Sequence, residues 1–173
     1  SRIFVQNQLE RVWSNCVGGH EPQGDQVDTS VARVKLEEIL KALAKVPKGF
    51  KIHSKLKRLL KGRLEMAAGE KPLDWGTAEA LAFSSLAADG TRVRLTGQDS
   101  ERGTFSHRHA VWHDVENGAV YRPMNHVADA QATVEIMNSP LSEIGVLGYE
   151  YGYSLDAPDV LVAWEAQFGD FVN

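Results

Sequence analysis

The sequence predicts an α/β fold, and two observations carry that prediction. A helix-forming segment ends at Gly90 and is followed by a strand pattern at 91–97, which together make half of an α/β repeat. The same order recurs at 138–159 and 160–166, where a helix-like segment precedes a nearly continuous apolar strand. We therefore expect helices packed against a sheet.

Helices are expected before that sheet. Residues 1–15 carry apolar side chains at roughly helical spacing, and the polar segment 18–26 is expected to be a loop. A helix then begins near 28–30, where side-chain oxygens can cap free amides, and ends at 47–50. A second helix is predicted over 53–68, with leucines along one side and basic residues along the other.

A third helix and two further strands follow. Asp74 can cap a helix that runs to about Ala88. Strands are predicted at 120–123 and 132–137, and the segment 104–131 is expected to be antiparallel or irregular.

The last helix and strand carry three expectations. Pro140 suits the first helical position of its segment. The apolar run at 160–166 predicts a strand that is buried on both faces. Because the chain stops at Asn173, before a helix that could cover this strand, we expect it to be a fragment.

Composition and charge exclude several classes of protein. The 173 residues are 43% hydrophobic and 24% charged, which is typical of a globular domain, and no apolar run is long enough to span a membrane. A basic segment over 30–71 contrasts with an acidic remainder. It lacks any nucleic-acid signature, so a solvated helix face is favoured, although docking on an acidic partner is an alternative.

Glu143 falls in the first turn of the predicted helix at 138–159. The simplest interpretation is a surface carboxylate that the free amides and the helix dipole favour. The same position suits a carboxylate that hydrogen-bonds a protonated ring nitrogen of a cofactor. Gly145, Gly148 and Gly152 indicate close approach to this helix, by another helix, a cofactor or a subunit, and they do not form a dinucleotide-binding fingerprint.

Two more groups of polar residues are candidates. Gln98 and Asp99 follow the predicted strand at its carboxyl end, where open α/β sheets bind ligands, although they could simply begin a turn. The histidines of the SHRHAVWH segment have spacings found in metal ligand sets, but no cysteine or carboxylate accompanies them at ligand spacing. We therefore predict no metal site in the chain.

Three stretches together resemble the decarboxylating first component of 2-oxoglutarate dehydrogenases: RLTGQDSERGTFSHRHAVWHD, NSPLSEIGVLGYEYGYS and VAWEAQFGDFVN. The resemblance implies an incomplete, three-layer transketolase-like pyrimidine-binding domain over 73–173. A basic helical connector over 28–72 would precede it, and 1–27 would be the helix end and loop of a preceding region.

The resemblance also implies roles for particular residues. Glu143 matches the family's activating glutamate, which bonds the pyrimidine ring of thiamine diphosphate. Gln98 matches a cofactor-contacting position, and Phe168 matches the aromatic residue that packs on the pyrimidine. Four more residues are expected to line or order the active-site region: Asp99, His107, Arg108 and His109. Mg²⁺ and the diphosphate would be bound by a domain that this sequence does not contain.

The implied activity belongs to a larger parent protein. It would decarboxylate 2-oxoglutarate and reductively succinylate the lipoyl group of a dihydrolipoamide succinyltransferase, as a homodimer in the cytoplasm or the mitochondrial matrix. We expect the isolated fragment to be inactive. Two alternatives remain: a related decarboxylating subunit for pyruvate or a branched-chain 2-oxo acid, and a non-catalytic module that docks through its basic face.

Overall fold

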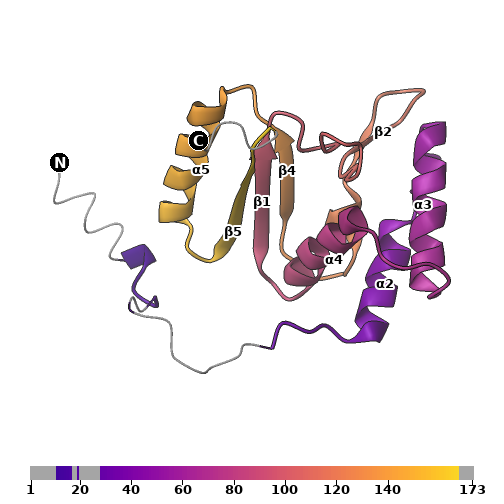
Figure 1. Ribbon diagram of the computed structural model, residues 1–173, viewed down its shortest axis with the longest axis horizontal. Helices are drawn as coiled ribbons and strands as arrows, with labels where there is room; N and C mark the ends of the chain where they lie inside the picture. Colours follow the sequence, from indigo (N-terminus) through magenta and orange to yellow (C-terminus); the bar gives the residue numbers. More distant parts are fainter. Residues whose placement is uncertain (1–10, 17–18, 20–27, 168–173) are drawn as a thin grey trace.

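The computed structural model describes residues 11–16, 19 and 28–167. Its elements, in chain order (Figure 1), are α2 (Arg33–Leu43), α3 (Ser54–Ala67), α4 (Trp75–Ala88), β1 (Arg92–Gly97), β2 (Trp112–His113), β3 (Val120–Tyr121), the 3-10 helix η1 (Pro123–His126), β4 (Val134–Asn138), α5 (Glu143–Asp156) and β5 (Val160–Glu165). Both predicted α/β repeats are confirmed. None of these described helices is long and apolar enough to cross a membrane.

The main sheet has three parallel strands in the order β4-β1-β5. Figure 1 shows α5 on one side of this sheet and α4 on the other, with α2 and α3 beyond α4. The arrangement is the predicted three-layer α/β fold. Because β1 is central, five consecutive residues of this strand are buried, as expected for a strand with both neighbours and both faces covered.

The principal hydrophobic core lies between the sheet and the helices α2 and α4. The alanine-rich sequence of α4 lets the helix approach closely, so that Ala80 and Ala87 are fully buried against the strands. Asp74 begins this helix, since its carboxylate accepts a hydrogen bond from the Thr77 amide at 2.8 Å. The predicted cap is confirmed.

A smaller cluster joins α3 to the antiparallel pair β2–β3. Trp112 is completely buried there, with Leu56 and Leu60 of α3, and its ring centroid lies 5.4 Å from that of Tyr121. The predicted antiparallel excursion is therefore confirmed, and the predicted helix over 53–68 is confirmed as α3.

Three details of the prediction are wrong. Asp28 caps a local turn, accepting a hydrogen bond from the Ser30 amide at 2.9 Å, and α2 begins later, at Arg33. Pro140 lies before α5, whose N-cap is Ser142. Residues of β5 are partly exposed, because β5 is an edge strand that has only β1 beside it among the described residues. Most of the predicted helix at 1–15 and of the loop at 18–26 falls outside the described residues.

Candidate functional site

The carboxyl ends of the three parallel strands meet at one edge of the sheet. Gly97 ends β1 and is paired in register with Asn138, which ends β4, and with Glu165, which ends β5. A Cβ atom on Gly97 would lie 2.5 Å from the backbone oxygen of Glu165, so only glycine allows this approach. Ligands of open α/β sheets bind outside this edge, and Gln98 is exposed there.

Glu143 begins α5 beside this edge and is buried, with 4% of its surface exposed. Neither of its carboxylate oxygens has a hydrogen-bond partner among the described residues. The interpretation of Glu143 as a surface carboxylate is therefore wrong. An ionisable group that is buried without a partner carries a large desolvation cost, which an incoming ligand can offset by supplying the missing hydrogen bonds.

A second buried carboxylate lies on the same face of α5. Glu143, Val146 and Glu150 are the buried residues of the helix and stand three and then four residues apart. Arg94 of β1 donates two hydrogen bonds to Glu150, at 2.7 and 3.0 Å, and a third to Glu135 at 3.0 Å. The hydrogen bond to Glu150 is the main cause that raises the pKa of Arg94 above its ordinary value. This clamp fixes α5 on the sheet and so positions Glu143.

Asp99 is engaged within its own loop. Arg102 forms an ion pair with its carboxylate, and the backbone oxygen of Asp99 accepts a hydrogen bond from the Gly103 amide at 2.7 Å. This segment therefore forms a turn, and Asp99 shapes the loop that follows β1.

Arg108 is 2% exposed and is fully committed to partners inside the chain. It binds both carboxylate oxygens of Glu79, at 2.5 and 2.9 Å, and Glu165 at 2.5 Å. Burial alone would lower the pKa of Arg108, but the hydrogen bonds and charges of Glu79 and Glu165 raise it above the ordinary value. Arg108 thereby ties α4 to the end of β5, beside the carboxyl edge of the sheet.

His107 and His109 face different surroundings. The Nδ1 atom of His107 is buried without a partner among the described residues, and its ring lies so close to Gly103 that a Cβ there would be 2.4 Å from Cε1. His109 has a φ of 44°, and its pKa is lowered by burial and then by the positive charges of Arg63 and Arg102.

His113, the third histidine of the motif, and His126, further along the chain, lie in different surroundings. His113 is exposed on β2, whereas the ring of His126 stacks on Tyr121 with centroids 4.8 Å apart. Within residues 11–16, 19 and 28–167 no group of three histidine, cysteine or acidic side chains is placed to hold a metal ion. Phe168, the expected pyrimidine-packing residue, lies outside the described residues.

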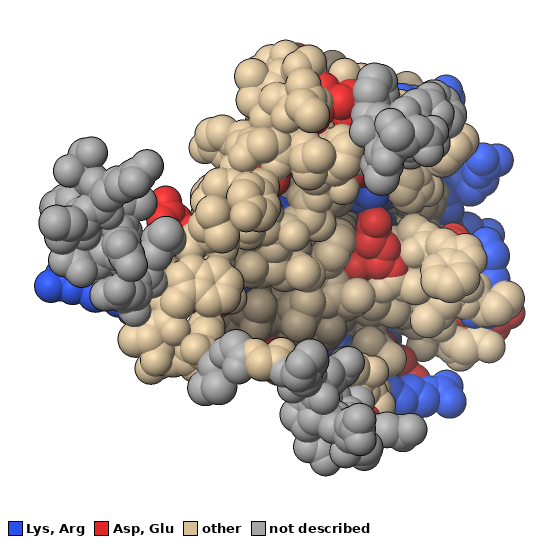
Figure 2. All heavy atoms as spheres, turned by 60° about the vertical axis from the view of Figure 1, so that its left-hand side comes forward, with Lys and Arg blue, Asp and Glu red and all other residues tan. Residues whose placement is uncertain are grey.

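The outer face of α5 is open. Its large apolar side chains Ile144 and Tyr151 are 78% and 65% exposed. Figure 2, in which the α5 side of the molecule is turned forward, shows few charged residues on this face. Side chains added at Gly148 or Gly152 would meet nothing within 4 Å among the described residues. The close approach that these glycines predict is therefore not made by another described part of this chain.

Arg94 and Glu150 were missed by sequence reasoning. A signal was available for Glu150, because a glutamate seven residues after Glu143 falls on the same face of a helix. The arginine in the middle of the apolar strand RVRLTG was a second signal, since a charge in a buried central strand needs a partner.

A three-layer α/β domain with a buried carboxylate that lacks a partner among the described residues, at the carboxyl edge of its parallel sheet, belongs to the class of ligand-binding α/β domains. The chain belongs, more particularly, to the family of transketolase pyrimidine-binding domains, which matches residues 71–173.

Curated relatives agree with this assignment. The chain is 52% identical over 149 residues to the 2-oxoglutarate dehydrogenase E1 component of Oceanobacillus iheyensis, covering 86% of the chain and 16% of that protein. It is 51% identical over 154 residues to the mitochondrial 2-oxoglutarate dehydrogenase of Saccharomyces cerevisiae, covering 89% and 15%. It is 53% identical over 152 residues to the mitochondrial enzyme of Schizosaccharomyces pombe, covering 88% and 14%. The chain thus spans 14–16% of the length of these relatives.

Proposed function

We propose that the chain is the pyrimidine-binding part of a thiamine-diphosphate-dependent 2-oxoglutarate dehydrogenase E1 component. The observation that carries the proposal is the carboxylate of Glu143, which is buried and has no hydrogen-bond partner among the described residues. A protonated ring nitrogen of the cofactor's pyrimidine would supply that partner. The names of the relatives support 2-oxoglutarate over pyruvate or a branched-chain 2-oxo acid as the substrate.

The residues of this chain would bind and polarise the pyrimidine. The buried carboxylate of Glu143 would accept a hydrogen bond from the pyrimidine ring, and a charged acceptor is strong in a buried position. Arg94 and Glu150 hold the helix that carries Glu143. Gln98 would contact the cofactor from the end of β1, and Phe168 is proposed to pack on the ring. Thiamine diphosphate, once bound, supplies the electron sink that decarboxylation of a 2-oxo acid requires.

The remaining parts of the proposal concern the parent protein. It would transfer a succinyl group to the lipoyl group of a dihydrolipoamide succinyltransferase, and Mg²⁺ would bind with the diphosphate on another domain. The exposed apolar side chains of α5 support a homodimer in which this face meets another subunit. The bacterial and mitochondrial relatives support a cytoplasmic or matrix location. Rates of the parent on 2-oxoglutarate, pyruvate and a branched-chain 2-oxo acid test the substrate.

The role of Glu143 is tested by the substitution Glu143→Gln in the full-length protein. We expect exchange of the thiazolium proton of bound thiamine diphosphate to slow by at least about a hundredfold, the lower range of an acid–base contribution. The matched control is Glu116→Gln, on the exposed turn between β2 and β3, which should leave the exchange rate unchanged. Exchange at a near-normal rate in Glu143→Gln, with cofactor bound, would contradict the assignment.

A further inference from the structure

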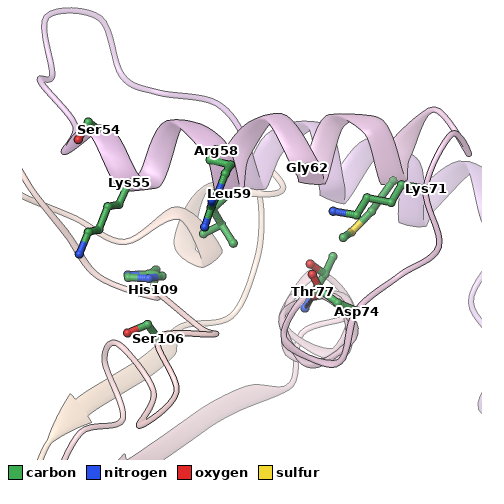
Figure 3. Close-up of a pocket in the computed structure, with 11 residues that line it drawn as sticks. Ser54, Lys55, Arg58, Leu59, Gly62, Lys71, Asp74, Thr77, Ser106 and His109 are labelled. Carbon is green, nitrogen blue, oxygen red and sulfur yellow. Dashed lines mark hydrogen bonds between the residues drawn. The ribbon is translucent and has the colours of Figure 1, made fainter.

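A cavity lies between α3, the start of α4 and the loop after β1 that carries Ser106 and His109 (Figure 3). Its volume is about 640 Å³, which is in the range of small-molecule sites. Leu59 and Met66 contribute an apolar part of its lining. We call this cavity the α3 pocket.

Three cationic side chains extend into the α3 pocket. Lys55 and Arg58 lie on one face of α3, with Gly62 a further turn along the same face. Because Gly62 has no side chain, Lys71 reaches over it from the segment after α3, and its Nζ atom lies 3.7 Å from the position of a Cβ on Gly62. Figure 3 shows Lys55, Arg58 and Lys71 projecting beneath α3 toward the cavity.

The charges of these cations are not balanced within the pocket. Among the described residues no acidic side chain forms an ion pair with Lys55, Arg58 or Lys71. Asp74 is the acidic residue of the lining, and its carboxylate is already used to cap α4 at the Thr77 amide. Like charges gathered at one concave surface repel each other, and a bound anion relieves that repulsion.

The wall opposite α3 supplies neutral polar groups. Ser106 and His109 have φ angles of 52° and 44°, and they are the non-glycine residues with positive φ in the described part of the chain. Such backbone conformations persist where the surroundings enforce them, and they cluster at ligand sites. The pKa of His109 is lowered, first by burial and then by Arg63 and Arg102, which favours the neutral form of its ring.

We propose that the α3 pocket binds a small-molecule anion whose phosphate or carboxylate group is held by Lys55, Arg58 and Lys71. The concave shape and the partly apolar lining favour a small molecule over an acidic protein surface. The inference does not depend on the role of Glu143. Two kinds of ligand carry such an anionic group: a 2-oxo diacid, through its carboxylate, and a separate metabolite, through its phosphate.

Calorimetric titration of the full-length protein without thiamine diphosphate tests the proposal. Inorganic phosphate and 2-oxoglutarate are titrated separately at low ionic strength, where interactions with exposed cations are strongest. The pocket variant is Lys55→Gln/Arg58→Gln, and the matched control is Lys57→Gln/Lys61→Gln, which removes two positive charges from the same helix outside the pocket. The single variant Lys71→Gln, outside α3, answers the question if the pocket variant does not fold.

We expect at least one of the two anions to bind, with an affinity at least tenfold lower in the pocket variant and within twofold of wild type in the control. Binding of phosphate alone identifies a separate metabolite as the source, and competition between the two anions identifies a site that both can enter. The proposal is overturned if neither anion binds the wild-type protein, or if pocket and control variants lose the same affinity.

Discussion

The start and the middle of α5 carry the same chemical group in opposite circumstances. Glu143 and Glu150 are both glutamates, both 4% exposed, and both on the face of the helix that meets the sheet. Glu150 receives two hydrogen bonds from Arg94, whereas Glu143 receives none from any described residue. The comparison teaches that burial alone does not distinguish a structural carboxylate from a functional one; the presence of a partner within the chain does.

The largest loss of stability is expected from the carboxylate in the middle of the helix. Glu150→Gln leaves Glu135 as the charged partner of the buried Arg94, so the free energy of unfolding should fall by about 3 kcal/mol, the typical cost of removing one partner of a buried pair. Urea unfolding of the full-length protein at pH 7 measures it. Glu135→Gln is the control, and because the Glu135 side chain is 35% exposed it should cost less than about 1 kcal/mol. Equal losses of unfolding free energy in Glu150→Gln and Glu135→Gln would mean that Glu150 is not the main structural partner of Arg94.

Arg108 is a buried cation whose carboxylate partners lie within the chain, so its substitution tests the same distinction. Arg108→Lys replaces a planar group that bonds Glu79 and Glu165 simultaneously with a single ammonium. We expect the free energy of unfolding to fall by about 2 kcal/mol, since charge-assisted hydrogen bonds are lost in a buried site. The measurement is again urea unfolding. A lysine variant as stable as wild type would mean that Arg108 is not held by its two carboxylates.

Asp74 is an exposed carboxylate, and the smallest loss of stability is expected from its substitution. Asp74→Ala removes the hydrogen bond to the Thr77 amide at the start of α4, and the expected loss in the free energy of unfolding is about 1 kcal/mol. Asp74→Asn keeps an acceptor in the same place and should stay within a few tenths of wild type. Thermal unfolding of both variants checks the pair. If asparagine costs as much as alanine, the cap does not act through this hydrogen bond.

The fold could be predicted from local patterns because each pattern has one physical cause. The glycine after α4 and the apolar runs of β1 and β5 mark helix ends and parallel strands, and Asp74 marks a helix start. The burial of β5 could not be predicted in the same way. Edge position depends on which strands pair, and strand order is not written in the sequence of one strand.

The candidate site was only partly accessible to sequence reasoning. Resemblance to a family identified Glu143, but dipole arguments placed it on the surface, because burial of a helix start depends on the packing of distant elements. Arg108 was expected near the active site, and its commitment to Glu79 and Glu165 became visible only when residues 29 and 57 positions away were brought together. The cations of the α3 pocket are exposed, as the predicted solvated face requires, and their position around one cavity depends on how α3 packs beside α4.

The central claim is that Glu143 lacks a partner among the described residues and receives one from the cofactor. Its most direct test is thermal unfolding of full-length wild type, Glu143→Gln and Glu150→Gln, each with and without thiamine diphosphate and Mg²⁺. Without cofactor, we predict that Glu143→Gln is at least as stable as wild type, because the buried Glu143 side chain has no hydrogen bond to a described residue to lose, while Glu150→Gln is less stable. With cofactor, wild type gains stability and Glu143→Gln gains much less. A Glu143→Gln protein that is as destabilised as Glu150→Gln, and still gains the full cofactor-dependent stability, would contradict the account.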